Sequence, residues 1–96
     1  MNIQINGEVV RSEVDFHREL ASILGVESSY GFNTDALWDL LSSGVGRPIF
    51  LRWVNAGVSK KIMGKSYFDI LNILERVKMQ DEGFGWVEKF TYKIDF

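Results

Sequence analysis

Three short strand-like segments are separated by stretches long enough for helices, and this order restricts the fold more than any other feature of the sequence. Ile3 and Ile5 alternate with polar neighbours. Residues 49–54 form a nearly continuous apolar run, which predicts a central strand buried on both faces. Residues 89–94 alternate, with lysines on the polar side, as at a protected sheet edge. Helical crossovers favour right-handed parallel connections. The sequence therefore predicts an α/β fold, a small three-stranded parallel sheet covered by helices.

The first two helices are marked by their ends. Ser12, followed by Asp15, has the pattern of a capping box, and Gly25 suits a left-handed C-terminal cap. Helical spacing predicts that this helix buries Phe16, Leu20, Ile23 and Leu24. Asn33 can cap the next helix, which ends near Gly44 or Gly46. Its apolar face comprises Leu37, Leu40 and Leu41.

Two further helical segments are expected before the last strand. A short turn of helix is predicted around residues 58–63. Ser66 with Asp69 repeats the capping-box pattern and predicts a helix that runs to about Met79 and is ended by residues 81–83. Its apolar positions are Ile70, Leu71, Leu74 and Val77.

Length, composition and charge limit the class of protein. The 96 residues correspond to one domain, 1–96, and 46% hydrophobic content is sufficient for a core. There is no cysteine, which excludes disulfides and thiolate metal sites. The first residues lack the order of a signal peptide, so we expect a cytoplasmic protein. The net charge of -2 lacks the basic surplus of a nucleic-acid binder and permits a basic partner.

The sequence does not predict an enzyme, a cofactor or a metal site. His17 is the only histidine, and its place beside Phe16 in a helix indicates a structural or surface role. Residues 64–66 (Gly-Lys-Ser) resemble the end of a phosphate-binding loop, but Ser59 stands where that motif requires glycine. An enzyme on the same scaffold is the less favoured alternative.

One face of the second helix is the strongest candidate for a binding site. Asp35 and Asp39 lie opposite the leucine face, Ser42 lies between them, and Trp38 lies on the flank. Like charges at this spacing destabilise a helix by roughly 0.2–0.5 kcal/mol. A partner bearing Arg, Lys or protonated His would relieve that repulsion through charge-assisted hydrogen bonds. The alternative from the residues alone is an ordinary solvated face with a half-buried tryptophan.

Residues 30–41, YGFNTDALWDLL, resemble the signature of the barstar family of intracellular inhibitors of the ribonuclease barnase. Residues 5–8, the pair Phe16-His17 and Pro48 also match the family, and the similarity covers nearly the whole chain. The resemblance implies a barstar-like domain. It also implies that the Arg47-Pro48 peptide bond is a candidate for the cis form, as in the family.

The resemblance implies that this protein inhibits a secreted-type or toxin ribonuclease with a basic cleft, as an antitoxin or immunity protein that is a monomer when free. Asp39 would take the place of an RNA phosphate, and Asp35 would make a second polar contact. No direct contact with nucleic acid or membrane is expected. The predicted partner-binding residues are Tyr30, Gly31, Asn33, Asp35, Trp38, Asp39, Ser42, Gly44, Glu75 and Arg76.

The periphery of this site departs from the family pattern. Ser29 and Gly44 stand where a family member has aromatic residues. Gly46 and Gln80 replace acids, and Arg76 stands where another acid is expected, unless a shift of helix register exchanges it with Glu75. A retained centre with a changed periphery indicates altered specificity. A barstar-fold module or antitoxin directed at a partner other than a ribonuclease therefore remains the alternative function.

Overall fold

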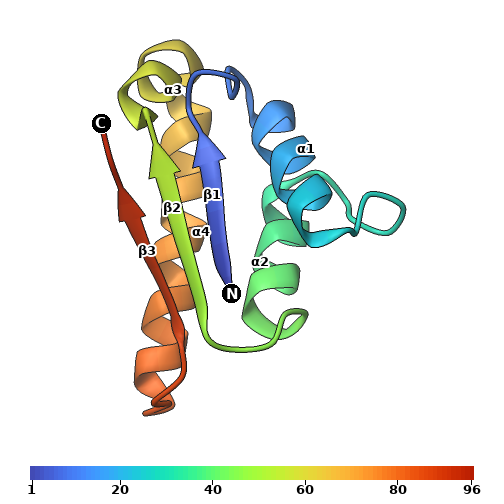
Figure 1. Cartoon of the computed structure of the whole chain (residues 1–96), viewed down its shortest axis with the longest axis vertical. Coiled ribbons are helices and arrows are strands. Elements are labelled where there is room, and N and C mark those ends of the chain that lie inside the picture. The colour runs from blue at the N-terminus through green and yellow to red at the C-terminus, as the bar shows by residue number, and fades with distance from the viewer.

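The structure, a computed structural model, describes residues 1–96 as three strands and four helices (Figure 1). The elements are, in chain order, β1 (Asn2–Asn6), α1 (Glu13–Leu24), α2 (Thr34–Ser43), β2 (Ile49–Val54), α3 (Ala56–Met63), α4 (Lys65–Gly83) and β3 (Phe90–Ile94). Every predicted strand and helix is present.

The strands form one sheet in the order β1-β2-β3, with both pairs parallel. The register places Ile3 beside Leu51, and Leu51 beside Tyr92. Two helices connect each strand to the next, which is the length of connection that parallel neighbours require. The predicted three-stranded parallel sheet is confirmed.

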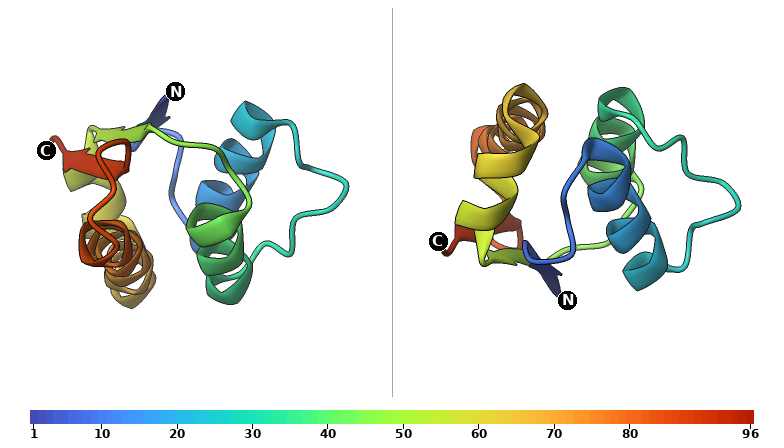
Figure 2. Two further views of the ribbon diagram at one scale, coloured as in Figure 1. Left: turned by 90° about the horizontal axis from the view of Figure 1, so that it is seen from below. Right: turned by 90° about the horizontal axis from the view of Figure 1, so that it is seen from above.

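The helices cover only one face of this sheet. In both views of Figure 2, the helices lie to one side of the strands, with α1 and α2 beyond the β1 edge. Accordingly β2 alternates: Leu51 and Trp53 are buried, whereas Phe50 is 37% exposed and Arg52 is exposed. The prediction that this strand is buried on both faces is therefore wrong. Arg52, inside the apolar run, marks the open face.

The core lies between the sheet and the helices, with Trp53 at its centre. The indole ring is fully buried, 4.9 Å from the ring of Phe16 on α1 and 5.1 Å from that of Tyr67 on α4. These contacts join one central strand to both helical connections. They fix how α1 and α4, which flank α2, are placed on the sheet.

The cap of α1 agrees with the sequence, although its details differ. The Ser12 hydroxyl accepts the Asp15 amide at 3.2 Å, and Gly25 has a φ of 68° at the C-terminal cap. The Asp15 carboxylate, however, accepts the amide of Arg11 rather than that of Ser12. Ile23, predicted to be in the core, is 43% exposed because it lies at the margin of the apolar face.

The predicted capping box of α4 is wrong. Gly64, with a φ of 60°, directly joins α3 to α4, so Ser66 already lies within the first turn. Its hydroxyl donates to the carbonyl of Met63 at 3.2 Å. The helix also passes the expected end at Met79 and continues to Gly83.

Two further observations complete the fold. The Arg47–Pro48 peptide bond is cis. None of the helices combines the length and the apolar character needed to cross a lipid bilayer.

Candidate functional site

Helix α2 is held at both ends and along one side. The side-chain oxygen of Asn33 accepts the amide of Ala36 at 2.8 Å, which caps the N-terminus. Leu37 and Leu41 are fully buried, and the amide of Gly44 donates to the carbonyl of Leu40 at 2.8 Å. These contacts fix which side of α2 faces solvent.

Asp35 and Asp39 lie on that solvent side, one turn apart and both exposed. The other four of the six aspartates form ion pairs within the chain. These pairs are Asp15 with Arg18, Asp69 with Lys65, Asp81 with Arg47, and Asp95 with Arg52. Neither Asp35 nor Asp39 belongs to any of these pairs. The exposed face of α2 thus carries two carboxylates that remain available to an external cation.

Trp38 borders this face and is covered by a cation from α4. The guanidinium carbon of Arg76 lies 4.6 Å from the centre of the indole ring, within cation–π range. The indole itself is half-buried against the core. The structure therefore brings Trp38 and Arg76 together at the boundary between α2 and α4.

Glu75 points to the other side of α4. Its carboxylate accepts the hydroxyl of Tyr92 on β3 at 2.7 Å. Burial, together with this bond and the charge of Glu75, raises the pKa of Tyr92 to about 12. The structure thus places Arg76 beside α2 and turns Glu75 toward the sheet, so a binding role for Glu75 stays a prediction without support from its orientation.

The loop before α2 is attached to α1 through a buried histidine. The hydroxyl of Tyr30 lies 2.6 Å from His17 Nδ1, and His17 Nε2 lies 3.0 Å from Glu13 Oε2. Burial lowers the pKa of His17, although the hydrogen bond and charge of Glu13 oppose that change. Burial also raises the pKa of Tyr30. His17 is a structural residue, and Tyr30 offers its ring rather than its hydroxyl to the surface.

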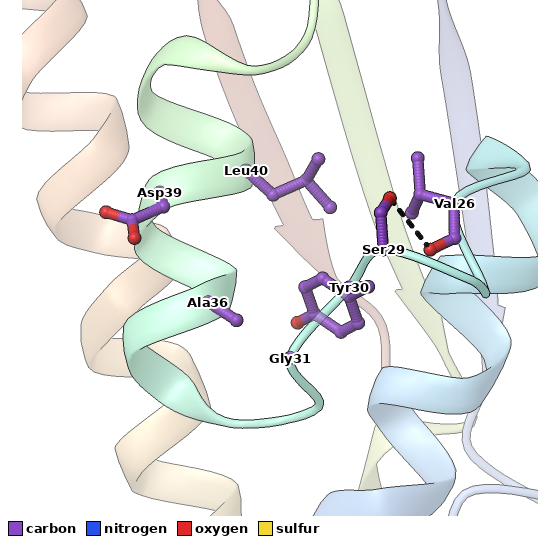
Figure 3. Close-up of a pocket in the computed structure, with 7 residues that line it drawn as sticks. All are labelled: Val26, Ser29, Tyr30, Gly31, Ala36, Asp39 and Leu40. Atoms are coloured by element: carbon purple, nitrogen blue, oxygen red, sulfur yellow. Dashed lines mark hydrogen bonds between the residues drawn. The ribbon is translucent and has the colours of Figure 1, made fainter.

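A hollow of about 280 Å³ lies between this loop and α2 (Figure 3). Ala36 and Leu40 point from α2 toward Tyr30, whereas the Asp39 carboxylate points away from that ring. The close approach depends on Gly31, since a Cβ there would lie 2.9 Å from the Cβ of Ala36. The sequence predicted Tyr30, Gly31 and Asp39 as site residues but not the hollow lined by Val26, Ser29, Ala36 and Leu40.

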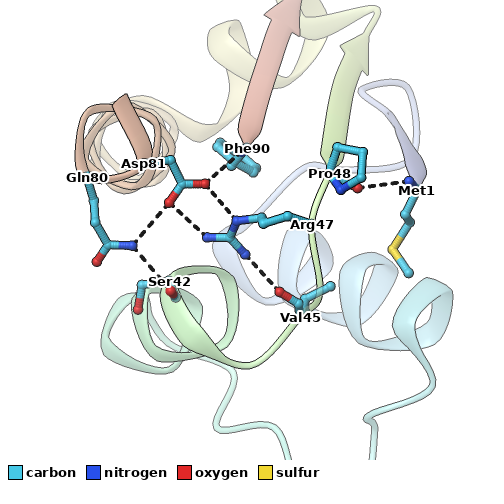
Figure 4. Close-up of polar contacts among 8 residues, drawn as sticks. All are labelled: Met1, Ser42, Val45, Arg47, Pro48, Gln80, Asp81 and Phe90. Carbon is cyan, nitrogen blue, oxygen red and sulfur yellow. Dashed lines mark hydrogen bonds and ion pairs between the residues drawn. The ribbon is translucent and has the colours of Figure 1, made fainter. Parts of the chain in front are cut away.

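The C-terminal end of α2 is fixed to α4 and to the following loop (Figure 4). The carbonyl of Ser42 accepts the side-chain amide of Gln80 at 3.2 Å. Arg47 donates to both carboxylate oxygens of Asp81, at 2.6 and 3.1 Å, and to the carbonyl of Val45 at 2.8 Å. Ser42 and exposed Gly44 are thereby held beside α4.

Asp81 is the centre of this contact and is fully buried. Its carboxylate also accepts hydrogen bonds from the backbone amide of Phe90 at 2.7 Å and from the side-chain amide of Gln80 at 3.2 Å. Burial alone would raise the pKa of Asp81, but the hydrogen bonds from Arg47, Phe90 and Gln80 and the charge of Arg47 outweigh it and lower the pKa. Asp81 is not among the site residues predicted from the sequence. Its position could have indicated burial, because it lies four residues after Val77 on the apolar face of the helix. A buried carboxylate requires a charged or hydrogen-bonding partner.

No group of three or more His, Asp or Glu side chains is arranged to hold a metal ion. The surface of α2 offers two carboxylates outside the ion pairs of the chain, with apolar side chains beside them.

Comparison with known proteins relates this chain to a family and to a bacterial protein. Residues 1–92 match the family described as "Barstar (barnase inhibitor)". A protein of Bacillus subtilis (strain 168), "Putative ribonuclease inhibitor YrdF", is 30% identical over 82 residues, which cover 83% of this chain and 90% of the relative.

Proposed function

The chain belongs to the barstar family, and from this premise we propose that it inhibits a barnase-type ribonuclease by placing the exposed face of α2 in the active-site cleft of the enzyme. The observation that carries the proposal is the pair Asp35 and Asp39, exposed and free of internal ion pairs on a helix fixed at both ends.

The chemistry of the target explains why carboxylates suit this task. A site that cleaves RNA binds phosphate through cationic side chains, so a carboxylate placed there accepts the same charge-assisted hydrogen bonds. Asp39, in the middle of α2, is the residue assigned to the phosphate position. Asp35, one turn nearer the N-terminus, makes the second polar contact. Complementary charge also accelerates association.

The surrounding residues complete the proposed contact surface. Gly31 lets the loop pass close to the start of α2, because a Cβ there would lie 2.9 Å from the Cβ of Ala36, and Asn33 caps the helix through a hydrogen bond of 2.8 Å. The ring of Tyr30 lines the hollow beside them. Trp38 with Arg76, and Ser42 with Gly44, border the carboxylates on the α4 side and at the helix end.

The experiment is a titration of RNA cleavage by barnase-type ribonucleases with the parent protein and three variants. Asp39→Ala should weaken inhibition at least about tenfold, since it removes at least one charge-assisted hydrogen bond. Asp39→Asn keeps the shape and removes the charge, and it should also weaken inhibition. Glu82→Ala removes an exposed carboxylate near the end of α4 and serves as the matched control.

Stoichiometric inhibition that depends on Asp39 and not on Glu82 would support the proposal. Equal losses in the Asp39 and Glu82 variants would contradict the assignment of Asp39 as the anchor. No inhibition of any ribonuclease tested would point to a partner of another class.

The proposed role in the cell follows from this activity. A protein that occupies the cleft of a ribonuclease protects the RNA of the cell that makes the enzyme, as an antitoxin or immunity protein in the cytoplasm. A single chain is sufficient, because one chain supplies every proposed contact residue.

A further inference from the structure

A second exposed surface lies at the C-terminal end of α4, outside the residues assigned above. It is the turn from Phe84 to Val87, which joins α4 to β3. The exposed fractions are 61% for Phe84, 43% for Trp86 and 95% for Val87. Met79, on the last turns of α4, is also exposed. Four large apolar side chains in nine residues form a concentrated patch rather than scattered exposure.

This turn has a defined conformation despite its exposure. The rings of Phe84 and Trp86 lie 5.0 Å apart at an interplanar angle of 34°. Gly85 has a φ of 70°, which permits the reversal between them. The guanidinium of Arg47 lies 5.7 Å from the Trp86 ring while it is bound to the buried carboxylate of Asp81. The two aromatic rings are therefore held in place before any partner arrives, which reduces the entropy lost on binding.

The turn is continuous with the proposed binding face of α2. Gln80 joins α4 to the carbonyl of Ser42, and Arg47 joins Asp81 to the carbonyl of Val45 just beyond α2 (Figure 4). Arg76 lies against Trp38, the neighbour of Asp39, and Phe84 follows Arg76 by eight residues, or about 12 Å of helix. An interface of about 800 Å² on one partner has a radius of about 16 Å. The turn therefore lies at the rim of an ordinary interface centred on Asp39.

The α2 face alone has few apolar anchors. Trp38 is half-buried and covered by Arg76, and Gly44 offers no side chain at the helix end. Asp39 is the proposed charged anchor, and desolvated aromatic side chains beside such an anchor add binding free energy of their own. Phe84 and Trp86 are exposed aromatic rings attached to the same rigid block as α2.

We propose that the Phe84–Val87 turn is a second contact area of the ribonuclease-binding surface and receives apolar side chains from the rim of the enzyme's cleft. This inference rests on the proposed function. It also assigns part of the partner specificity to residues outside α2, because a nuclease without an apolar rim gains nothing from the turn.

The test is the dissociation constant for barnase-type ribonucleases, measured by calorimetry for the parent and for three variants. The double variant Phe84→Ser/Val87→Ser removes the most exposed side chains and leaves Trp86 on Arg47. Phe68→Ser is the matched control, since Phe68 is 54% exposed on the same helix and about 24 Å of helix away. Asp39→Ala is measured in parallel, and urea unfolding verifies that each variant is folded.

The double variant should bind about tenfold to a hundredfold more weakly, as expected when burial of one or two large apolar side chains is lost. Phe68→Ser should bind as the parent does. Unchanged binding by the double variant, with a loss in Asp39→Ala, would overturn this inference and leave the proposed function intact. A parent that binds none of the ribonucleases would contradict both. A parent that sediments as a dimer, and becomes a monomer in the double variant with unchanged nuclease affinity, would assign the turn to self-association and overturn the inference.

Discussion

Replacement of Asp81 by leucine tests how much the buried ion pair with Arg47 stabilises the fold. The carboxylate accepts two bonds from Arg47 and one from the amide of Phe90, and the Arg47 side chain is only 10% exposed. Removal of one member of such a pair leaves the other charge buried without a partner and costs about 3–5 kcal/mol. Domains of this kind have a free energy of unfolding of about 5–15 kcal/mol, so the loss is a large part of the total.

The measurement is urea unfolding followed by tryptophan fluorescence, to which the buried Trp53 contributes together with Trp38 and Trp86. With a denaturant slope of about 1–3 kcal/mol/M, the midpoint of Asp81→Leu should fall by at least about 1 M. The double variant Arg47→Met/Asp81→Leu should recover much of this loss, because it removes both charges. It should remain about 1–3 kcal/mol below the parent, since the amide of Phe90 still lacks its acceptor.

Glu82→Gln is the control, because it changes an exposed carboxylate at the same end of α4. If Asp81→Leu were no more destabilising than Glu82→Gln, Asp81 would not be the centre of a buried network. If the double variant lost the sum of the stabilities lost by Asp81→Leu and by Arg47→Met, measured separately, Arg47 and Asp81 would not be energetically coupled. Either result would refute the reasoning.

Three further predictions concern His17, Gly7 and Asn33. Burial lowers the pKa of His17 below its ordinary 6.5, so the unfolded chain binds the proton more readily than the folded chain. The free energy of unfolding should therefore fall as the pH is lowered from about 7.5. His17→Gln should reduce the slope of the free energy of unfolding against pH. Gly7→Ala should destabilise the fold by more than about 2 kcal/mol in urea unfolding, because its Cβ would lie 2.0 Å from the carbonyl oxygen of Asn55. Gly46→Ala is the control and should leave the stability unchanged, because a Cβ at that position has no atom within 4 Å. Asn33→Ala should cost about 1 kcal/mol of stability through loss of the α2 cap, and Asn33→Asp should restore it.

The features that could be predicted from sequence are those encoded within a few residues. Ser12 and Gly25 mark the ends of α1 through contacts three to five residues long. The exposed position of Asp35 and Asp39 follows from the helical period once Leu37 is placed in the core. Local patterns therefore predicted the elements, the sheet order and the carboxylate face.

The features that could not be predicted depend on contacts between distant parts of the chain. Arg47 and Asp81 are 34 residues apart, and nothing near either residue identifies the other. The open face of β2 depends on where all four helices pack, so the apolar run that includes Phe50 was misleading. The pattern at Ser66 was ambiguous for a related reason, since the turn at Gly64 places the helix start one residue before Ser66.

The same distant contacts explain how a short helix can carry two uncompensated charges. Asp35 and Asp39 repel each other, which weakens an isolated helix by a few tenths of a kcal/mol. A helix of ten residues is marginal in water on its own. Here the Asn33 cap, the buried leucines and the Gln80 contact with Ser42 hold α2 in position at both ends. The helix is therefore ordered before binding, and a cationic cleft that relieves the repulsion gains affinity without the entropic cost of folding the helix.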